Sequence, residues 1–176
     1  MGGSRRDVLR RKYVSLGVGE LVAALVFGLV AALSVAPRLH GTEVSALWSA
    51  LAPLLVVLVQ GGAYWLLARR WVGAEPMPRS LAAAYRLFRV ADPVLLALGL
   101  AGLVAWWPQA TGPAVLCLLA WVFGVVEYVN YFVVRLAYPP SRWLALVGQR
   151  RVPRLVQDLR EGRCASGAMR RSTLAR

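Results

Sequence analysis

Apolar residues fall into four long runs along this chain, separated by short segments rich in polar and charged residues. A hydrocarbon core of about 30 Å needs roughly 20 residues of α-helix, because each residue advances the helix by about 1.5 Å. Each run is long enough to cross such a core. The pattern therefore predicts an all-α membrane protein, a four-transmembrane-helix bundle with spans at about 13–36, 44–68, 90–107 and 113–134.

Basic residues are unevenly divided among the segments that flank these runs. Five Lys and Arg lie in the basic N-terminus (1–12), five between the second and third spans, and ten from Arg135 onward, whereas the two remaining connections share only Arg38. Because positively charged loops stay on the cytoplasmic side, both termini are predicted in the cytoplasm of a multi-pass protein. Twenty arginines against one lysine are typical of a bacterium with a GC-rich genome. The expected location is thus the bacterial cytoplasmic (inner) membrane.

Composition narrows the class of protein further. The chain is 59% hydrophobic and 16% charged, which is too apolar for a soluble domain of 176 residues. Its formal net charge of +13 could in principle attract nucleic acid. The charges lie next to membrane spans, however, where anionic lipid headgroups on the cytoplasmic side are the nearer partner. Membrane lipids are therefore expected as partners and nucleic acid is not.

Two segments outside the spans have the pattern of interfacial amphipathic helices. One begins at Arg79, where Leu81, Tyr85 and Phe88 recur at helical spacing. The other lies within 139–161, with Pro153 in its first turn and apolar Val152, Leu155, Val156 and Leu159 among arginines. Residues 162–176 lack this periodicity and are predicted to be disordered. The expected lipid-headgroup contacts are Arg79, Arg86, Arg89, Arg150, Arg151 and Arg154, and the expected interface anchors are Trp71, Trp106, Trp107 and Trp143.

Several polar residues lie inside the predicted spans, where a lipid-facing position is costly. Counted from the nearest basic residue at the inner boundary, Glu20, Gln60 and Glu127 are eight or nine residues deep, roughly 12 to 14 Å. Together with Asn130 they are predicted to form one polar layer inside the bundle. Asp92 lies only three residues past Arg89, so we expect it nearer the interface, starting a helix before Pro93.

Stripes of small residues on the same faces predict that these groups point into the bundle. Gly17, Ala24, Gly28 and Ala32 flank Glu20 on the first span, and Gly99 and Gly102 follow Asp92 on the third. Such stripes let a second helix approach closely. They also leave open a homodimer or a membrane protein partner.

Three interpretations of the polar layer remain open. Its groups can join helices by hydrogen bonds, form a proton or substrate site, or hold a cation. Glu20 and Glu127, if close together, would favour sharing one proton, because two desolvated carboxylates repel each other. Arg135 could instead neutralise Glu127, with Tyr131 between them on the same helix face. The supporting residues are Tyr128, Tyr131, Arg135 and Asp92.

No catalytic pattern appears in the chain. His40 is the only histidine and lies in a predicted outer turn beside Glu43, so a transition-metal or haem site lacks ligands. Cys117 and Cys164 have no redox spacing. We therefore expect no enzyme activity, no metal and no cofactor.

The fourth span carries the string Glu127-Tyr128-Val129-Asn130-Tyr131, followed by Arg135-Leu136 and later by the basic stretch 150–159. This arrangement resembles a group of small uncharacterised bacterial integral membrane proteins with an E-Y-x-N-Y motif in the last span. The resemblance covers about 35 of the 176 residues. It implies no assigned activity, but it marks Glu127, Tyr128, Asn130 and Tyr131 as the residues of most interest.

The sequence thus predicts a small polytopic membrane protein with a non-enzymatic role, as an accessory or scaffold subunit. The alternative is a proton-coupled small-molecule transporter or channel that uses Glu20 and Glu127. The two differ in what Glu127→Gln would do. It would abolish flux in a transporter, whereas it would weaken folding or partner binding in a scaffold.

Overall fold

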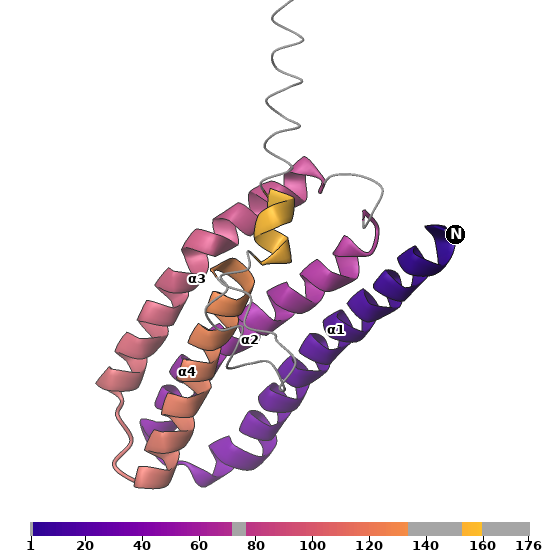
Figure 1. The fold of residues 1–176 in the computed structure, drawn as a ribbon. Coiled ribbons are helices and arrows are strands. Elements are labelled where there is room, and N and C mark those ends of the chain that lie inside the picture. The colour runs from indigo at the N-terminus through magenta and orange to yellow at the C-terminus, as the bar shows by residue number, and fades with distance from the viewer. Residues whose placement is uncertain (1, 72–76, 134–152, 160–176) are drawn as a thin grey trace, which may run out of the picture.

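The computed structural model describes residues 2–71, 77–133 and 153–159, and these are helical apart from short connections (Figure 1). Helix α1 (Gly2–Val30) continues through a π-helical turn, η1 (Ala31–Val35), and a 3₁₀ turn, η2 (Ala36–Arg38). Helices α2 (Glu43–Ala68), α3 (Arg79–Ala105) and α4 (Thr111–Phe132) follow, and residues 154–159 form a further helical stretch. Each of the four long helices is long and apolar enough to cross a membrane. The predicted all-α four-helix bundle is confirmed.

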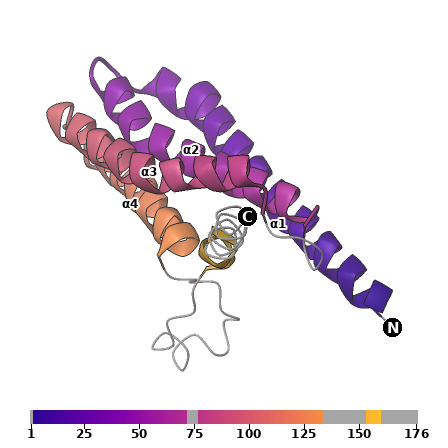
Figure 2. The ribbon, with the colours of Figure 1, turned by 90° about the horizontal axis from the view of Figure 1, so that it is seen from above.

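Helix α2 is the centre of the bundle. It contacts α1, α3 and α4, and Figure 2 shows the other helices arranged around it. Half of its apolar stretch is buried inside the protein, against 17 to 22% for the other three helices. The outer helices instead turn most of their apolar surface outward, as helices in contact with lipid do. Side chains exposed in this way include Leu25, Leu29, Leu98, Val104 and Leu119.

Glycines allow the helices around α2 to approach it closely. A Cβ added at Gly17 of α1 would lie 2.9 Å from the Gly62 carbonyl oxygen of α2, so only glycine fits there. On the other side of α2, a Cβ added at Gly99 would lie 2.6 Å from the Ser49 carbonyl oxygen, beside the Pro53 ring. These contacts confirm that Gly17 and Gly99 serve helix packing, as the small-residue stripes predicted. Ala32, in contrast, is exposed, and Ala31, three residues after Gly28, lies in the core instead.

The third span differs from its prediction. An interfacial helix from Arg79 and a separate span from residue 90 were expected, but α3 runs without interruption from Arg79 to Ala105. Asp92 and Pro93 therefore lie inside a helix, and the expected helix start at Asp92 is wrong. Asp92 is only 1% exposed and its carboxylate meets a partner on α2, so it cannot cap a helix at the membrane surface.

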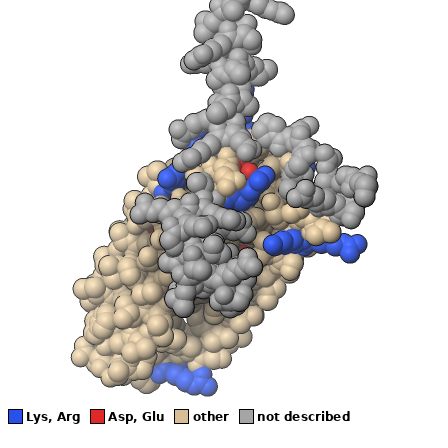
Figure 3. All heavy atoms as spheres, viewed as in Figure 1, with Lys and Arg blue, Asp and Glu red and all other residues tan. Residues whose placement is uncertain are grey.

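The bundle has two chemically different ends. Figure 3 shows most of the visible blue Lys and Arg side chains toward one end, one blue patch at the other, and largely uncharged surface between them. One end, called the basic end here, holds the starts of α1 and α3 and the last turns of α2 and α4 (Figure 1). At the opposite end, short turns join α1 to α2 and α3 to α4. Gly41, in the first of these turns, has φ +55°, a left-handed conformation that favours glycine.

Residues 153–159 pack against the basic end of the bundle. The Pro153 carbonyl accepts a hydrogen bond from the Gln157 N–H at 3.1 Å, so Pro153 directly precedes the first turn of the 154–159 stretch, one residue before its predicted place. Leu155, Val156 and Leu159 are 2 to 6% exposed, and Leu155 and Leu159 join a core cluster with Tyr64 and Tyr85. The apolar face predicted to lie along a lipid surface is thus covered by other helices of the protein. Val152 and the predicted disordered segment 162–176 lie outside the described residues.

Candidate functional site

The polar layer begins with a contact between the first and last helices. The Tyr131 hydroxyl of α4 donates a hydrogen bond to Glu20 Oε1 of α1, with 2.7 Å between the oxygens. The same hydroxyl accepts a bond from the Trp65 indole N–H of α2 at 3.3 Å. Gly61 of α2 leaves the space that the Tyr131 ring fills. One tyrosine therefore connects three helices at the depth of Glu20.

Glu127 lies one turn before Tyr131 on α4. Its carboxylate is hydrogen-bonded to the Asn130 side chain and is close enough to Glu20 to interact electrostatically. Its Oε2 atom is buried and has no hydrogen-bond partner among the described residues. The structure thus brings Glu20, Glu127 and Asn130 together, as the predicted layer required, and leaves one carboxylate oxygen of Glu127 unused.

Gln60 joins the layer to α3 rather than to the two glutamates. Its side-chain amide donates to Asp92 Oδ1 at 3.0 Å. Gln60 Oε1 and Asp92 Oδ2 are both buried without a partner among the described residues. Asp92 was expected at a shallower level, but this bond places it at the level of Gln60. The amide is the partner that allows a carboxyl group to be buried here.

Tyr128 bonds a backbone carbonyl that Pro93 leaves without its helical partner. Pro93 has no N–H, so the carbonyl of Arg89, four residues earlier in α3, loses its usual helical partner. The Tyr128 hydroxyl of α4 donates to that carbonyl oxygen at 3.0 Å. A neighbouring helix thus satisfies the backbone group that proline frees, which is the usual condition for proline inside a membrane helix. All four polar residues of the E-Y-x-N-Y string therefore form hydrogen bonds within the bundle: Glu127 and Asn130 with each other, Tyr128 with α3, and Tyr131 with α1 and α2.

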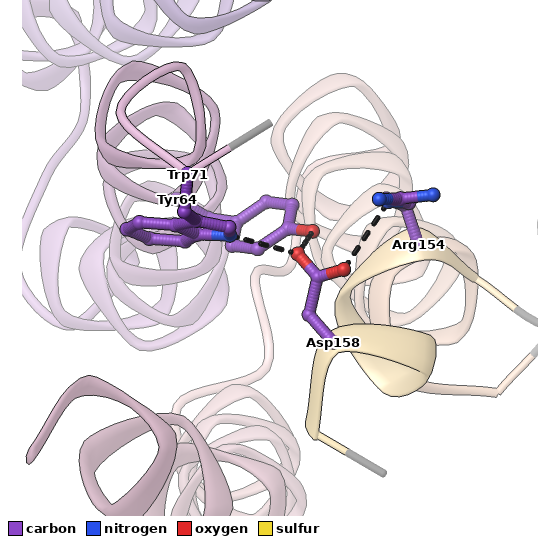
Figure 4. A network of polar contacts seen from close by, with 4 residues as sticks. All are labelled: Tyr64, Trp71, Arg154 and Asp158. Carbon is purple, nitrogen blue, oxygen red and sulfur yellow. Dashed lines mark hydrogen bonds and ion pairs between the residues drawn. The ribbon is translucent and has the colours of Figure 1, made fainter. Parts of the chain in front are cut away.

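A second polar group lies at the basic end and was not predicted from the sequence. Figure 4 shows Asp158, from the 154–159 helical stretch, pointing at two aromatic side chains of the α2 region. Asp158 Oδ2 accepts hydrogen bonds from the Tyr64 hydroxyl at 2.9 Å and from the Trp71 indole N–H at 3.2 Å. Its Oδ1 lies 3.2 Å from Arg154 Nε, close enough for an ion pair but not aligned as a hydrogen bond. We call Tyr64, Trp71, Arg154 and Asp158 the Asp158 cluster.

Aromatic rings join this cluster to the polar layer. Tyr13 of α1 packs on Trp65, Trp65 on Tyr64, and Tyr64 on Tyr85 of α3, with ring centroids 5.1 to 5.7 Å apart in edge-to-face geometry. The Tyr85 hydroxyl also donates to the Gln60 carbonyl oxygen at 2.9 Å. The polar layer and the Asp158 cluster are therefore parts of one connected structure across the basic half of the bundle.

The remaining predicted residues are placed as follows. Arg79, Arg86 and Arg89 are exposed on α3, as lipid-headgroup contacts would be, while Arg154 is half-buried and engaged with Asp158. Trp106 and Trp107 are exposed at the end of α3, but Trp71 is buried, so its expected role as an interface anchor is wrong. Arg135, Trp143, Arg150, Arg151 and Cys164 lie outside the described residues.

One signal in the sequence could have found Asp158. It stands three residues after Leu155 and one before Leu159, so it falls on the apolar face of the amphipathic pattern. An acidic residue on such a face indicates a buried partner. What the sequence could not supply was the identity of that partner, since Tyr64 and Trp71 are 94 and 87 residues away along the chain.

Among the described residues, no three His, Cys, Asp or Glu side chains lie together as a metal site would require. The chemistry available is that of carboxyl, amide, phenol and indole groups, which can bind helices together or exchange protons. No protein-family model, no curated protein and no solved structure matches this chain.

Proposed function

We propose that this protein is a non-enzymatic membrane protein that acts as an accessory or scaffold subunit. The observation that carries the proposal is that the buried and half-buried acidic groups bond between elements. Glu20 joins α1 to α4, Asp92 joins α3 to α2, and Asp158 joins the 154–159 stretch to α2. Bonds of this kind hold helices at fixed positions, which is what a protein that presents a surface to a partner needs.

The location that fits this proposal is the bacterial cytoplasmic membrane, with the basic end and both termini in the cytoplasm. Its support is the distribution of Lys and Arg. The test uses single cysteines at His40 and at Arg79, with Cys117 and Cys164 replaced by serine. A membrane-impermeant maleimide added to intact cells should label the cysteine at position 40 and not that at position 79. The reverse pattern would show the opposite orientation.

A second candidate, a proton-coupled transporter or channel, is favoured by a different observation. Glu127 Oε2, Asp92 Oδ2 and Gln60 Oε1 are buried and lack partners among the described residues. A purely structural layer would gain stability from pairing such atoms, since an unpaired buried polar atom costs about 1 to 3 kcal/mol. The unpaired carboxylate oxygens of Glu127, which lies near Glu20, and of Asp92 are also groups that could take up and release a proton.

Proton flux in proteoliposomes under an imposed potential separates the two candidates. Wild type is compared with Glu127→Gln and with Glu43→Gln, a matched change at the opposite end of the bundle. The scaffold proposal expects no flux above empty liposomes in any of the three, with Glu127→Gln unfolding at a lower temperature. Flux in wild type and in Glu43→Gln that disappears in a folded Glu127→Gln would overturn it in favour of transport.

A further inference from the structure

A cavity separate from the polar layer lies at the basic end, between α1 and the residues that follow α2. Its volume is about 710 Å³. Four of its lining residues are arginines, and the others are small or apolar. The lining residues are Arg10, Arg11, Val14, Ser15, Val18, Arg69 and Arg70.

The four guanidinium groups have no acidic partner in the part of the chain that the structure describes. All four side chains are exposed, and none makes an ion pair with a described residue. Asp7, one turn before Arg10 on α1, makes none either. The end of α2 favours Arg69 and Arg70, since cations stabilise a helix C-terminus, but Arg10 and Arg11 are in the interior of α1. Four like charges around one cavity repel each other unless an anion enters it.

The cavity changes character along α1. Val14 and Val18 continue its wall on the side of the membrane, and Val18 lies eight residues from Arg10, which is about 12 Å along the helix. A free anion would use only the arginine part of this wall. A molecule with a charged head and an apolar chain matches both parts, and such molecules surround the protein at this level of the membrane.

We propose that this cavity binds one anionic phospholipid. Its phosphate oxygens accept hydrogen bonds from the guanidinium groups of α1 and of the α2 end, since guanidinium groups bind phosphate through paired N–H donors. The first carbons of an acyl chain lie along Val14 and Val18. The site goes beyond the proposed scaffold role and does not depend on it. It would fix the spacing of α1 and α2 where they leave the membrane.

The test is native mass spectrometry of the full chain in a neutral detergent, with phosphatidylglycerol and phosphatidylcholine of the same acyl chains as probes. Arg10→Gln with Arg69→Gln removes one charge from each wall of the cavity. Lys12→Gln with Arg38→Gln removes the same charge from exposed positions that do not line the cavity and serves as the control. We expect the wild-type chain to bind one phosphatidylglycerol. The cavity variant should bind it roughly thirtyfold more weakly, because each arginine contributes about a factor of five to the affinity. The control variant should stay within about threefold of wild type.

Other outcomes would overturn the proposal. Equal losses in both double variants would mean general attraction by positive charge, and equal binding of phosphatidylcholine would mean that the headgroup is not recognised. Displacement of the lipid by inorganic phosphate at the same concentration would mean a site for a free anion. All variants are compared by thermal unfolding first. Should the double variant be unfolded, the single variants Arg10→Gln and Arg69→Gln give the same test, each with a loss of about fivefold.

Discussion

The cores of the two halves of the bundle consist of different residue types. In the basic half, the core contains Tyr13, Tyr64, Trp71, Tyr85 and Tyr131, and hydrogen bonds join side chains of different elements. In the opposite half, the core is made of alanine, leucine and Cys117, in residues such as Ala24, Ala46, Ala50, Leu54 and Leu103. Both halves are buried, but hydrogen bonds between helices are concentrated in the first, whereas among the described residues the core of the second has one such bond, from the Trp121 indole N–H to the Leu96 carbonyl oxygen at 2.9 Å.

The difference teaches how a membrane protein obtains a specific structure. Lipid chains are as apolar as leucine, so packing leucine against leucine gains little over leaving it in lipid. Close contact between small residues adds van der Waals attraction, and hydrogen bonds add direction. We therefore infer that the opposite half is held mainly by close packing, at positions such as Gly99, whereas hydrogen bonds in the basic half decide which helix faces meet.

The largest expected loss of stability is for substitution of Asp158. Replacing it with alanine leaves the Tyr64 hydroxyl and the Trp71 indole without an acceptor and should weaken docking of residues 153–159 by about 3 kcal/mol. Hydrogen exchange of the amides of 154–159 measures this directly. Asp158→Asn keeps one acceptor oxygen and should exchange more slowly than the alanine variant. Unchanged exchange in Asp158→Ala would contradict the role of the Asp158 cluster.

The next largest loss of stability is expected for Gly99→Ala, which tests the close approach of α3 to α2. In Gly99→Ala the new methyl group meets a backbone oxygen, which cannot rotate away, so α3 must move outward. We expect a loss of about 2 kcal/mol in the free energy of unfolding. Unfolding by SDS in mixed micelles measures it. Gly19→Ala is the matched control, because nothing lies within 4 Å of a Cβ there. Equal effects of the two substitutions would mean that this contact is not tight.

A smaller effect is expected for the bond between Glu20 and Tyr131. The single variants Glu20→Ala and Tyr131→Phe, with the double variant, give a coupling energy of about 0.6 to 1.7 kcal/mol, the range for hydrogen bonds between membrane helices. The same unfolding measurement serves. Additive effects of the two substitutions would show that the bond contributes nothing, and the contrast between the two halves would then rest on the aromatic packing.

The smallest loss of stability should be at Ala120, in the opposite half and on α4 rather than at the tight contact of α3 with α2. A cavity of about 410 Å³ opens between α1 and α4, and Ala120 lies on its apolar wall with Leu51 and Phe123. Ala120→Leu extends into this space and should change the free energy of unfolding by less than about 0.5 kcal/mol. Thermal unfolding checks this. A loss as large as that of Gly99→Ala would show that α4 packs in this half as tightly as α3 packs on α2 at Gly99.

Much of this architecture was predictable from the sequence. The errors arose where a residue of another helix satisfies a group that would otherwise change the local structure. The spans of α2 and α4 were placed to within two residues, because length and hydropathy suffice when lipid is the solvent. A helix was predicted to begin at Arg79, but its continuation into the third span was missed because Asp92 and Pro93 have the local pattern of a helix start. The Gln60 amide and the Tyr128 hydroxyl, both from other helices, satisfy the groups that would otherwise end the helix there.

By itself, the sequence determined that this chain has four membrane-spanning helices, and which faces of these helices carry polar and small residues. Those properties follow from the period of the helix and the thickness of the membrane, which act on each segment separately. Only the tertiary structure decided that Tyr131 meets Glu20, that Asp92 meets Gln60 and that Asp158 meets Tyr64. A side chain's partner depends on which helices are neighbours, and no single segment contains that information.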